Sequence, residues 1–183
     1  AAERAIGLEI PERAQAIRFM LGEVERIHSH LLNIGLACEV TGNYTIFMHI
    51  FRVREWSMEL AQILTGARKT YGVVAFGGVR RDITAVEIKK ALDLLEKIEN
   101  GAKECWQVLI NDKRQLTRLQ GIGVLDKKVA RDFSPVGPNI RASGFKRDNR
   151  YDHPHGFMKK LDFHPYVVNS CDVFGRVEVR YYE

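Results

Sequence analysis

The sequence has 183 residues but only three cysteines, and no two of them form a C-x-x-C pair. Cys38, Cys105 and Cys171 stand more than sixty residues apart, so no zinc or iron–sulfur site is encoded locally. An odd number of cysteines also argues against a disulfide framework. We interpret all three as buried or surface thiols in a reducing compartment.

Long apolar runs are also missing. No stretch approaches the roughly 18 apolar residues that a membrane-spanning helix requires. Residues Ala1 to Glu12 are charged and lack the hydrophobic region of a signal peptide. The first residue is not methionine and the sequence begins inside a helical pattern, so we expect a domain excised from a larger protein.

The common catalytic signatures are absent. No phosphate-binding loop, dinucleotide fingerprint, nucleophile elbow or H-E-x-x-H motif occurs, and no catalytic residue can be assigned. His28 and His30 lie two apart on a predicted helix and face different ways, and His28 is interpreted as a core residue. His153, His155 and His164 have no acid or thiol at a ligand spacing, so no metal site is predicted.

The composition is that of an ordinary globular protein, with 45% hydrophobic and 28% charged residues. The net charge is +5, but acidic residues stand among the basic ones in most segments, so no nucleic-acid partner is expected. Basic residues concentrate in two loops, Arg68 to Arg81 and Arg141 to Arg150. These loops are the candidates for a binding face.

Apolar periodicity predicts two helices in the first third of the chain. One begins at Pro11 and runs to about Val40, with Gly35 interrupting its stripe. The second runs from Thr45 to Leu64 and is ended by Gly66. This second helix is apolar on nearly every face, which indicates burial or contact with a partner.

A long third helix is predicted to follow. Thr84 and Glu87 have the spacing of a capping box, and an apolar stripe continues to Leu119 before Gly121. A helix of this length would extend about 50 Å. The sequence therefore predicts a mainly α fold: an elongated bundle of three or four long helices over residues 1–120.

Residues 121–183 are rich in glycine and proline, which predicts a small, irregular α+β part packed on the bundle. A short element is expected at Lys127 to Phe133. Ser170 could cap a last helix that begins at Asp172, although Val177 to Tyr181 also alternates like a strand.

Four side chains are predicted to be structural anchors. Arg54 and Glu55 lie on the most apolar helix, so each should be buried or at a subunit contact, with a partner of opposite charge. Arg141 stands among small residues in GPNIRASG, which suggests close backbone packing around a charged anchor. His30 completes the set.

Between the second and third helices, Tyr71 to Val79 forms a glycine-rich loop with a possible short strand at Val73-Val74. Paired glycines allow close backbone approach, and two adjacent arginines supply positive charge. The loop is either a face that binds a partner or a tight turn with solvated arginines. The candidate site residues are Gly77, Gly78, Arg80, Arg81 and Asp82.

The order of several motifs resembles the family that comprises the large (catalytic) subunits of nickel–iron hydrogenases and the D subunit of respiratory complex I. The resemblance covers nearly the whole chain, and the joint order of the motifs is specific. The motifs are ERAQAIR (12–18), GEVERIHSHL (22–31), FRVRE (51–55), TGAR (65–68), GGVRRDI (77–83), GPNIRASG (137–144), the acid-arginine-acid set Asp148, Arg150 and Asp152, and CDVFGRVEVRYYE (171–183).

In the hydrogenases of this family, the resemblance implies, four thiolates in two C-x-x-C pairs hold nickel and iron. Neither pair is present here, so we expect no cofactor in this fragment, no activity from it alone, and a nickel–iron centre in the parent subunit. Quinone-reducing relatives carry an acidic residue where Val40 stands, with Glu39 beside it. This difference favours the energy-converting, formate-hydrogenlyase-like hydrogenases over the D subunit of an NADH- or other donor:quinone oxidoreductase.

The resemblance also implies partners: a small iron–sulfur subunit, whose proximal cluster the loop from Gly77 to Asp82 would face, and membrane subunits at the cytoplasmic side of the cell membrane. Arg80 and Arg81 would then stabilise a reduced cluster. A non-enzymatic helical interaction module is the alternative from another class. The isolated fragment is expected to self-associate through helices near residues 1–66.

Overall fold

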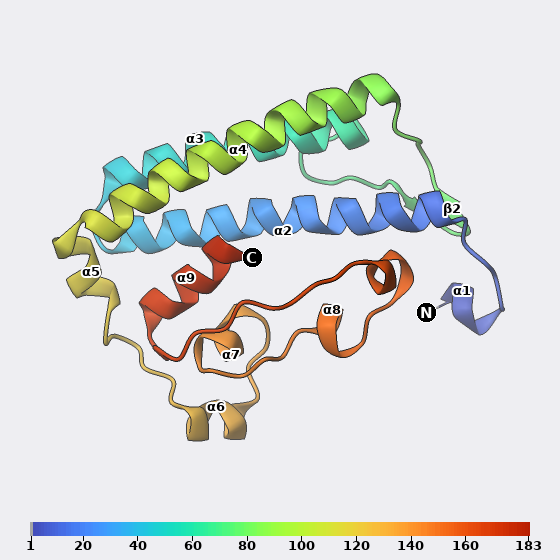
Figure 1. Ribbon diagram of the computed structural model, residues 1–183. Coiled ribbons are helices and arrows are strands. Elements are labelled where there is room, and N and C mark those ends of the chain that lie inside the picture. The colour runs from blue at the N-terminus through green and yellow to red at the C-terminus, as the bar shows by residue number, and fades with distance from the viewer. Residues whose placement is uncertain (1) are drawn as a thin grey trace.

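The structure is a computed structural model that describes residues 2–183, and it has a mainly α fold with a small strand component (Figure 1). Its elements in chain order are α1 (Ala2–Ala5), α2 (Glu12–Val40), α3 (Tyr44–Thr65), β1 (Val74–Ala75), β2 (Gly78–Val79), α4 (Ala85–Asn111), α5 (Lys113–Leu119), α6 (Lys127–Phe133), α7 (Pro138–Ala142), α8 (Asn149–Asp152), the 3-10 helix η1 (Gly156–Lys160) and α9 (Val173–Tyr182).

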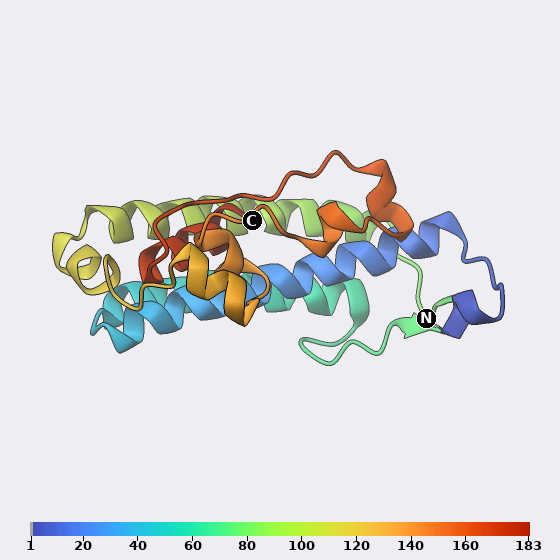
Figure 2. The same cartoon turned by 90° about the horizontal axis from the view of Figure 1, so that it is seen from below.

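Helix α2 is the central element. Helices α3 and α4 lie along one side of it, and the segment after α5 returns along the other side, as both views show (Figures 1 and 2). The end of α9 packs against the middle of α2, and the hairpin of β1 and β2 lies at its N-terminal end. The division of the chain at residues 120 and 121 into two parts stays a prediction.

The long helices form where periodicity and capping agree. Asn43 caps α3 by accepting a hydrogen bond from the Ile46 amide, and Gly66 ends α3 in the left-handed conformation at φ 82°. Thr84 and Glu87 form the predicted capping box of α4. The stripe that α2 buries follows the helical period: Ala14, Ile17, Leu21, Val24, His28, Leu31, Ile34, Gly35 and Cys38.

Two glycines let the long helices approach closely. A Cβ atom at Gly101 of α4 would lie 2.7 Å from Val53 and 2.9 Å from Trp56 on α3. Gly35 was expected to interrupt the apolar stripe of the first helix, and α2 runs through it with Gly35 buried on that stripe. Its role is a packing one, because a Cβ there would lie 2.9 Å from the Phe51 ring.

The third predicted helix is divided, which corrects its length. Helix α4 has 27 residues, about 40 Å, and ends at Asn111. Asp112 then caps α5 by accepting hydrogen bonds from the amides of Arg114 and Gln115. Its carboxylate also accepts a hydrogen bond from Asn43 at 3.1 Å, so a tertiary contact fixes the break.

The part after Gly121 is irregular but helical, and the strands lie instead in the glycine-rich loop. Residues from Val177 to Tyr181 belong to α9, which Asp172 caps rather than Ser170. Val177 and Val179 are both buried because α9 packs against α2 and α5 as well as α7. A helix covered on two sides can carry apolar residues two apart, which explains the strand-like alternation.

Helix α3 is buried on one face only. Tyr44 and Met48 are each 63% exposed, so within this chain the prediction of burial on nearly all faces is wrong. Contact of the exposed face with a partner stays a prediction. In residues 2–183, no helix is both long and apolar enough to cross a membrane.

Candidate functional site

The glycine-rich loop ends in a two-stranded antiparallel hairpin, in which Val74 pairs with Val79 and Ala75 with Gly78. Gly77 turns the chain with φ 83°, a conformation that side-chain-bearing residues rarely adopt. The guanidinium of Arg18 on α2 holds this turn, since it donates hydrogen bonds to the carbonyl oxygens of Ala75 and Gly78 at 2.7 Å. The hairpin is therefore attached to the bundle through backbone groups.

Glu3 on α1 completes this attachment. Its carboxylate accepts a hydrogen bond from the Gly77 amide at 2.8 Å and two from Arg18, at 2.8 and 2.9 Å. The hydrogen bonds from Arg18, followed by that from Gly77, lower the pKa of Glu3 to about 2. The carboxylate is therefore ionised at neutral pH.

A second arginine of α2 holds the end of the loop. Arg13 donates to Asp82 at 2.7 Å and to the Ile83 carbonyl oxygen at 2.8 Å. The bond from Arg13 places the pKa of Asp82 below its ordinary value. Both arginines of the ERAQAIR motif, Arg13 and Arg18, thus bind the loop that carries the candidate residues.

The two arginines of the loop differ in their surroundings. Arg81 forms an ion pair with Glu87, the acidic member of the α4 capping box, which offsets its charge. Arg80 is exposed and forms no ion pair with any residue between 2 and 183. Phe76 and Val74 of the hairpin are 65% and 59% exposed. Within the described residues, this loop thus exposes one positive charge without an ion-pair partner and two apolar side chains.

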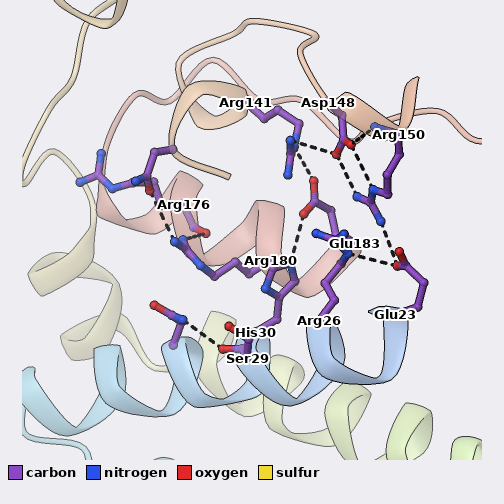
Figure 3. Close-up of polar contacts among 12 residues, drawn as sticks. Glu23, Arg26, Ser29, His30, Arg141, Asp148, Arg150, Arg176, Arg180 and Glu183 are labelled. Carbon is purple, nitrogen blue, oxygen red and sulfur yellow. Dashed lines mark hydrogen bonds and ion pairs between the residues drawn. The ribbon is translucent and has the colours of Figure 1, made fainter. Parts of the chain in front are cut away.

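A buried network of ion pairs connects α2 with the segments that contain α7, α8 and the end of α9 (Figure 3). Arg141 of α7 is 2% exposed and contacts Asp148 at 3.0 Å. It also pairs with Glu183, whose second carboxylate oxygen lies 3.1 Å from His30 Nε2 on α2. Arg141 and His30 therefore share the carboxylate of Glu183.

Arg150 extends the network to a second point on α2. Its guanidinium contacts Asp148 at 2.9 Å and Glu23 at 2.9 Å. Burial opposes ionisation of Asp148 and Glu183, but hydrogen bonds outweigh it and both pKa values lie below the ordinary ones. Each acid is a paired carboxylate, so the network has the character of a structural connection rather than of a general acid.

The two anchors predicted on α3 have different outcomes. Arg54 is half-buried and contacts the ring of His28, which stays in the core as expected. Burial and the nearby Arg54 lower the pKa of His28, so Arg54 has a neutral partner instead of an acid. Glu55 is exposed and pairs with Arg68 at the surface, so the prediction of burial within this chain is wrong for Glu55. It stands on the solvent side of α3.

The cysteines do not suit the metal centre that the resemblance implies for the parent subunit. Cys38 and Cys105 are buried between the long helices, and burial raises the pKa of Cys38 to about 12, which disfavours a thiolate. Within residues 2–183, no three histidine, cysteine or acidic side chains are grouped to hold a metal ion. His153, His155 and His164 are exposed.

Several site residues were not identified individually from the sequence, namely Glu3, Arg13, Arg18, Glu23 and Glu183. Arg13 and Arg18 belong to the first motif of the resemblance, Glu23 to the second and Glu183 to the last. Membership of those motifs was the available signal. Glu3 precedes all of them and had no such signal.

Two known proteins match nearly the whole chain. Over 178 residues the chain is 49% identical to formate hydrogenlyase subunit 5 of Escherichia coli (strain K12). The alignment covers 97% of this chain and 31% of that protein. It is 34% identical to the D subunit of the NADH-quinone oxidoreductase of Sulfurovum sp. (strain NBC37-1), over 96% of this chain and 43% of that protein. The chain thus spans 31% of the length of the first relative and 43% of the second.

A solved structure has the same fold. A chain of the membrane-bound sulfane sulfur reductase, an archaeal respiratory membrane complex, superposes with a TM-score of 0.90 at 37% identity, covering 98% of this chain and 48% of that one. The family profile described as respiratory-chain NADH dehydrogenase, 49 Kd subunit, matches residues 41–183. The chain therefore belongs to the family of this 49 Kd subunit, which includes hydrogenase subunits and the D subunit of NADH-quinone oxidoreductases.

Proposed function

We propose that this chain is the central domain of an energy-converting nickel–iron hydrogenase large subunit of the formate-hydrogenlyase type. The observation that carries the proposal is the 49% identity to formate hydrogenlyase subunit 5 along 97% of the chain. The domain supplies a scaffold for proton and hydrogen interconversion elsewhere in the subunit. It belongs to a complex with membrane subunits, at the cytoplasmic side of the membrane.

In this proposal the hairpin faces a small iron–sulfur subunit. Arg80 supports it, because its charge has no acidic partner within residues 2–183 and because the same hairpin exposes the apolar side chain of Phe76. A cationic guanidinium close to a cluster favours the reduced, more negative state, and the effect grows when a partner covers the site. Arg81 contributes less, since Glu87 already pairs with it.

The D subunit of a quinone-reducing complex is the second candidate, and its support is the 34% identity to such a protein. Val40, at the last turn of α2, argues for the hydrogenase branch, because the resemblance implies an acid at the matching position of quinone-reducing members. Val40 is 85% exposed at the end of its helix. An assay of the intact complex for hydrogen–proton isotope exchange and for quinone reduction decides between the branches.

The role of the hairpin is tested in the intact complex with Arg80→Ala. We expect a lower midpoint potential for the nearest iron–sulfur cluster, because a positive charge that stabilises the reduced state is lost. Redox titration followed by electron paramagnetic resonance measures it. Arg114→Ala is the matched control, since Arg114 is a 93% exposed arginine at the opposite end of the bundle. An unchanged potential in the Arg80 variant would leave only the tight-turn interpretation.

A further inference from the structure

We propose that Glu3 and Arg18 form a clasp that sets the position of the hairpin and, through it, of Arg80. Both are positioning residues, and their proposed effect on a partner's cluster rests on the proposed function above. The clasp joins two residues near the start of the sequence to a distant hairpin: Glu3 lies 74 residues before Gly77, and Arg18 lies 60 residues before Gly78.

The clasp binds backbone rather than side chains of the hairpin. Arg18 uses its whole guanidinium: Nε and Nη2 donate to the Gly78 carbonyl oxygen, and Nη2 also donates to that of Ala75. Nη1 and Nη2 donate to the two carboxylate oxygens of Glu3. Because Nη2 has two hydrogens and three acceptors, two of its acceptors share one hydrogen. A guanidinium reaches all these groups from three nitrogens, whereas a lysine ammonium has a single nitrogen.

Glu3 closes the arrangement from the opposite side. Its carboxylate accepts a hydrogen bond from the Gly77 amide at 2.8 Å. Gly77 is the residue at which φ is 83° and the chain reverses. The turn thus has its carbonyl oxygens bound by a cation and its amide by an anion, a combination that specifies one backbone conformation. The side chains of the pair are 19% and 21% exposed, so solvent competes only weakly.

The position of Arg80 follows from that of the turn. The Arg80 amide donates to the Val73 carbonyl oxygen at 2.8 Å, which continues the hairpin one residue beyond β2. The Arg80 side chain has no ion pair of its own within the described residues 2–183. Its location therefore depends on the backbone of the hairpin, and that backbone is held by Glu3 and Arg18.

Helix α1 has few other means of attachment. It has four residues and none of them is buried, so apolar packing does not hold Glu3 in place. The clasp consequently couples the segment at the start of the chain to the hairpin. Loss of the clasp should change the hairpin while leaving the core of α2, α3 and α4 intact.

The test uses Glu3→Gln and Arg18→Lys in the intact complex. Hydrogen–deuterium exchange of the peptide covering residues 72–82 should quicken about tenfold in both variants, the factor that loss of a hydrogen bond to a charged group implies. Exchange within α4 should not change. Glu12→Gln is the matched control: it removes the same charge at the start of α2, but within residues 2–183 Glu12 pairs only with the exposed Lys160.

The second measurement is the cluster potential. Arg18→Lys, which keeps the charge of the clasp, should lower it in the direction of Arg80→Ala but by less, and should add nothing in the double variant with Arg80→Ala, because its effect acts through the Arg80 guanidinium. Unchanged exchange at 72–82 in Glu3→Gln would overturn the clasp. Faster exchange with an unaltered potential, in a complex where Arg80→Ala does shift it, would overturn the positioning of Arg80. If Arg80→Ala shifts nothing, the proposed function fails, and exchange alone still decides whether the clasp exists.

Discussion

Helices α3 and α4 and the segment after Gly121 are held to α2 by different kinds of contact. The core of α2, α3 and α4 is almost entirely apolar, and His28 and Ser57 are its buried polar members. The shorter segment buries more polar groups than the bundle does: Arg141, Ser143, Asp148, Arg150 and Asp172. Apolar packing tolerates small adjustments, whereas an ion pair in the interior depends on the presence of its partner.

This difference predicts which substitutions destabilise each region. The largest effect is expected from Arg141→Ala, which leaves the carboxylates of Asp148 and Glu183 buried without their shared partner. Removing one member of a buried ion pair costs about 3–5 kcal/mol of unfolding free energy. Chemical denaturation measures the loss, and hydrogen exchange should show it concentrated in residues 137–183. Arg114→Ala, at an exposed arginine, should stay within about 0.5 kcal/mol.

Acid should weaken the same contacts without a mutation. Asp148 and Glu183 have pKa values below their ordinary 3.8 and 4.5, so they stabilise the fold above those values. That contribution is lost as pH falls from about 4.5 through the lower folded pKa values.

Trp106 stacks on Tyr181 of α9 with ring centroids 4.4 Å apart, so its fluorescence in a Trp56→Phe background reports the docking of α9.

The Trp106 signal should change in acid before far-ultraviolet circular dichroism shows loss of the long helices. The same acid titration of Arg141→Ala should show a much smaller change in this pH range. Simultaneous loss of both signals would mean that the two regions respond to acid as one.

A smaller effect is expected where the bundle is packed most closely. Gly101→Ala should destabilise the protein by about 1–3 kcal/mol, because its Cβ would overlap Val53 and Trp56. Gly22→Ala is the matched control on α2, since nothing lies within 4 Å of its Cβ position. It should stabilise by about 0.5–1 kcal/mol through helix propensity alone. Thermal melts that rank the two variants in reverse would contradict the close approach of α3 and α4.

The smallest effect is expected on the exposed face of α3. Glu55 pairs with Arg68 at the surface, where an ion pair contributes about 0–1 kcal/mol. Glu55→Ala and the control Glu59→Ala should therefore be similarly mild in thermal melts. A loss of several kcal/mol for Glu55→Ala alone would restore the prediction that this carboxylate is buried.

The sequence by itself determined the helical bundle. The apolar period of α2, the Gly66 end of α3 and the Thr84–Glu87 capping box depend on residues within a few positions of one another, so local physics fixes them. The short helix from Lys127 to Phe133 was predicted with its observed bounds. The break at Asp112 was missed because its second contact is to Asn43, 69 residues away.

Only the tertiary structure decided which charges meet. Nothing in the local pattern distinguishes Glu55, which is solvated, from Glu23, whose partner Arg150 stands 127 residues further along the chain. The same holds for Glu3 and the Gly77 amide. A charged side chain shows its partner only when the helices have packed, because ionic and backbone contacts act over a few ångströms in space and carry no period along the chain.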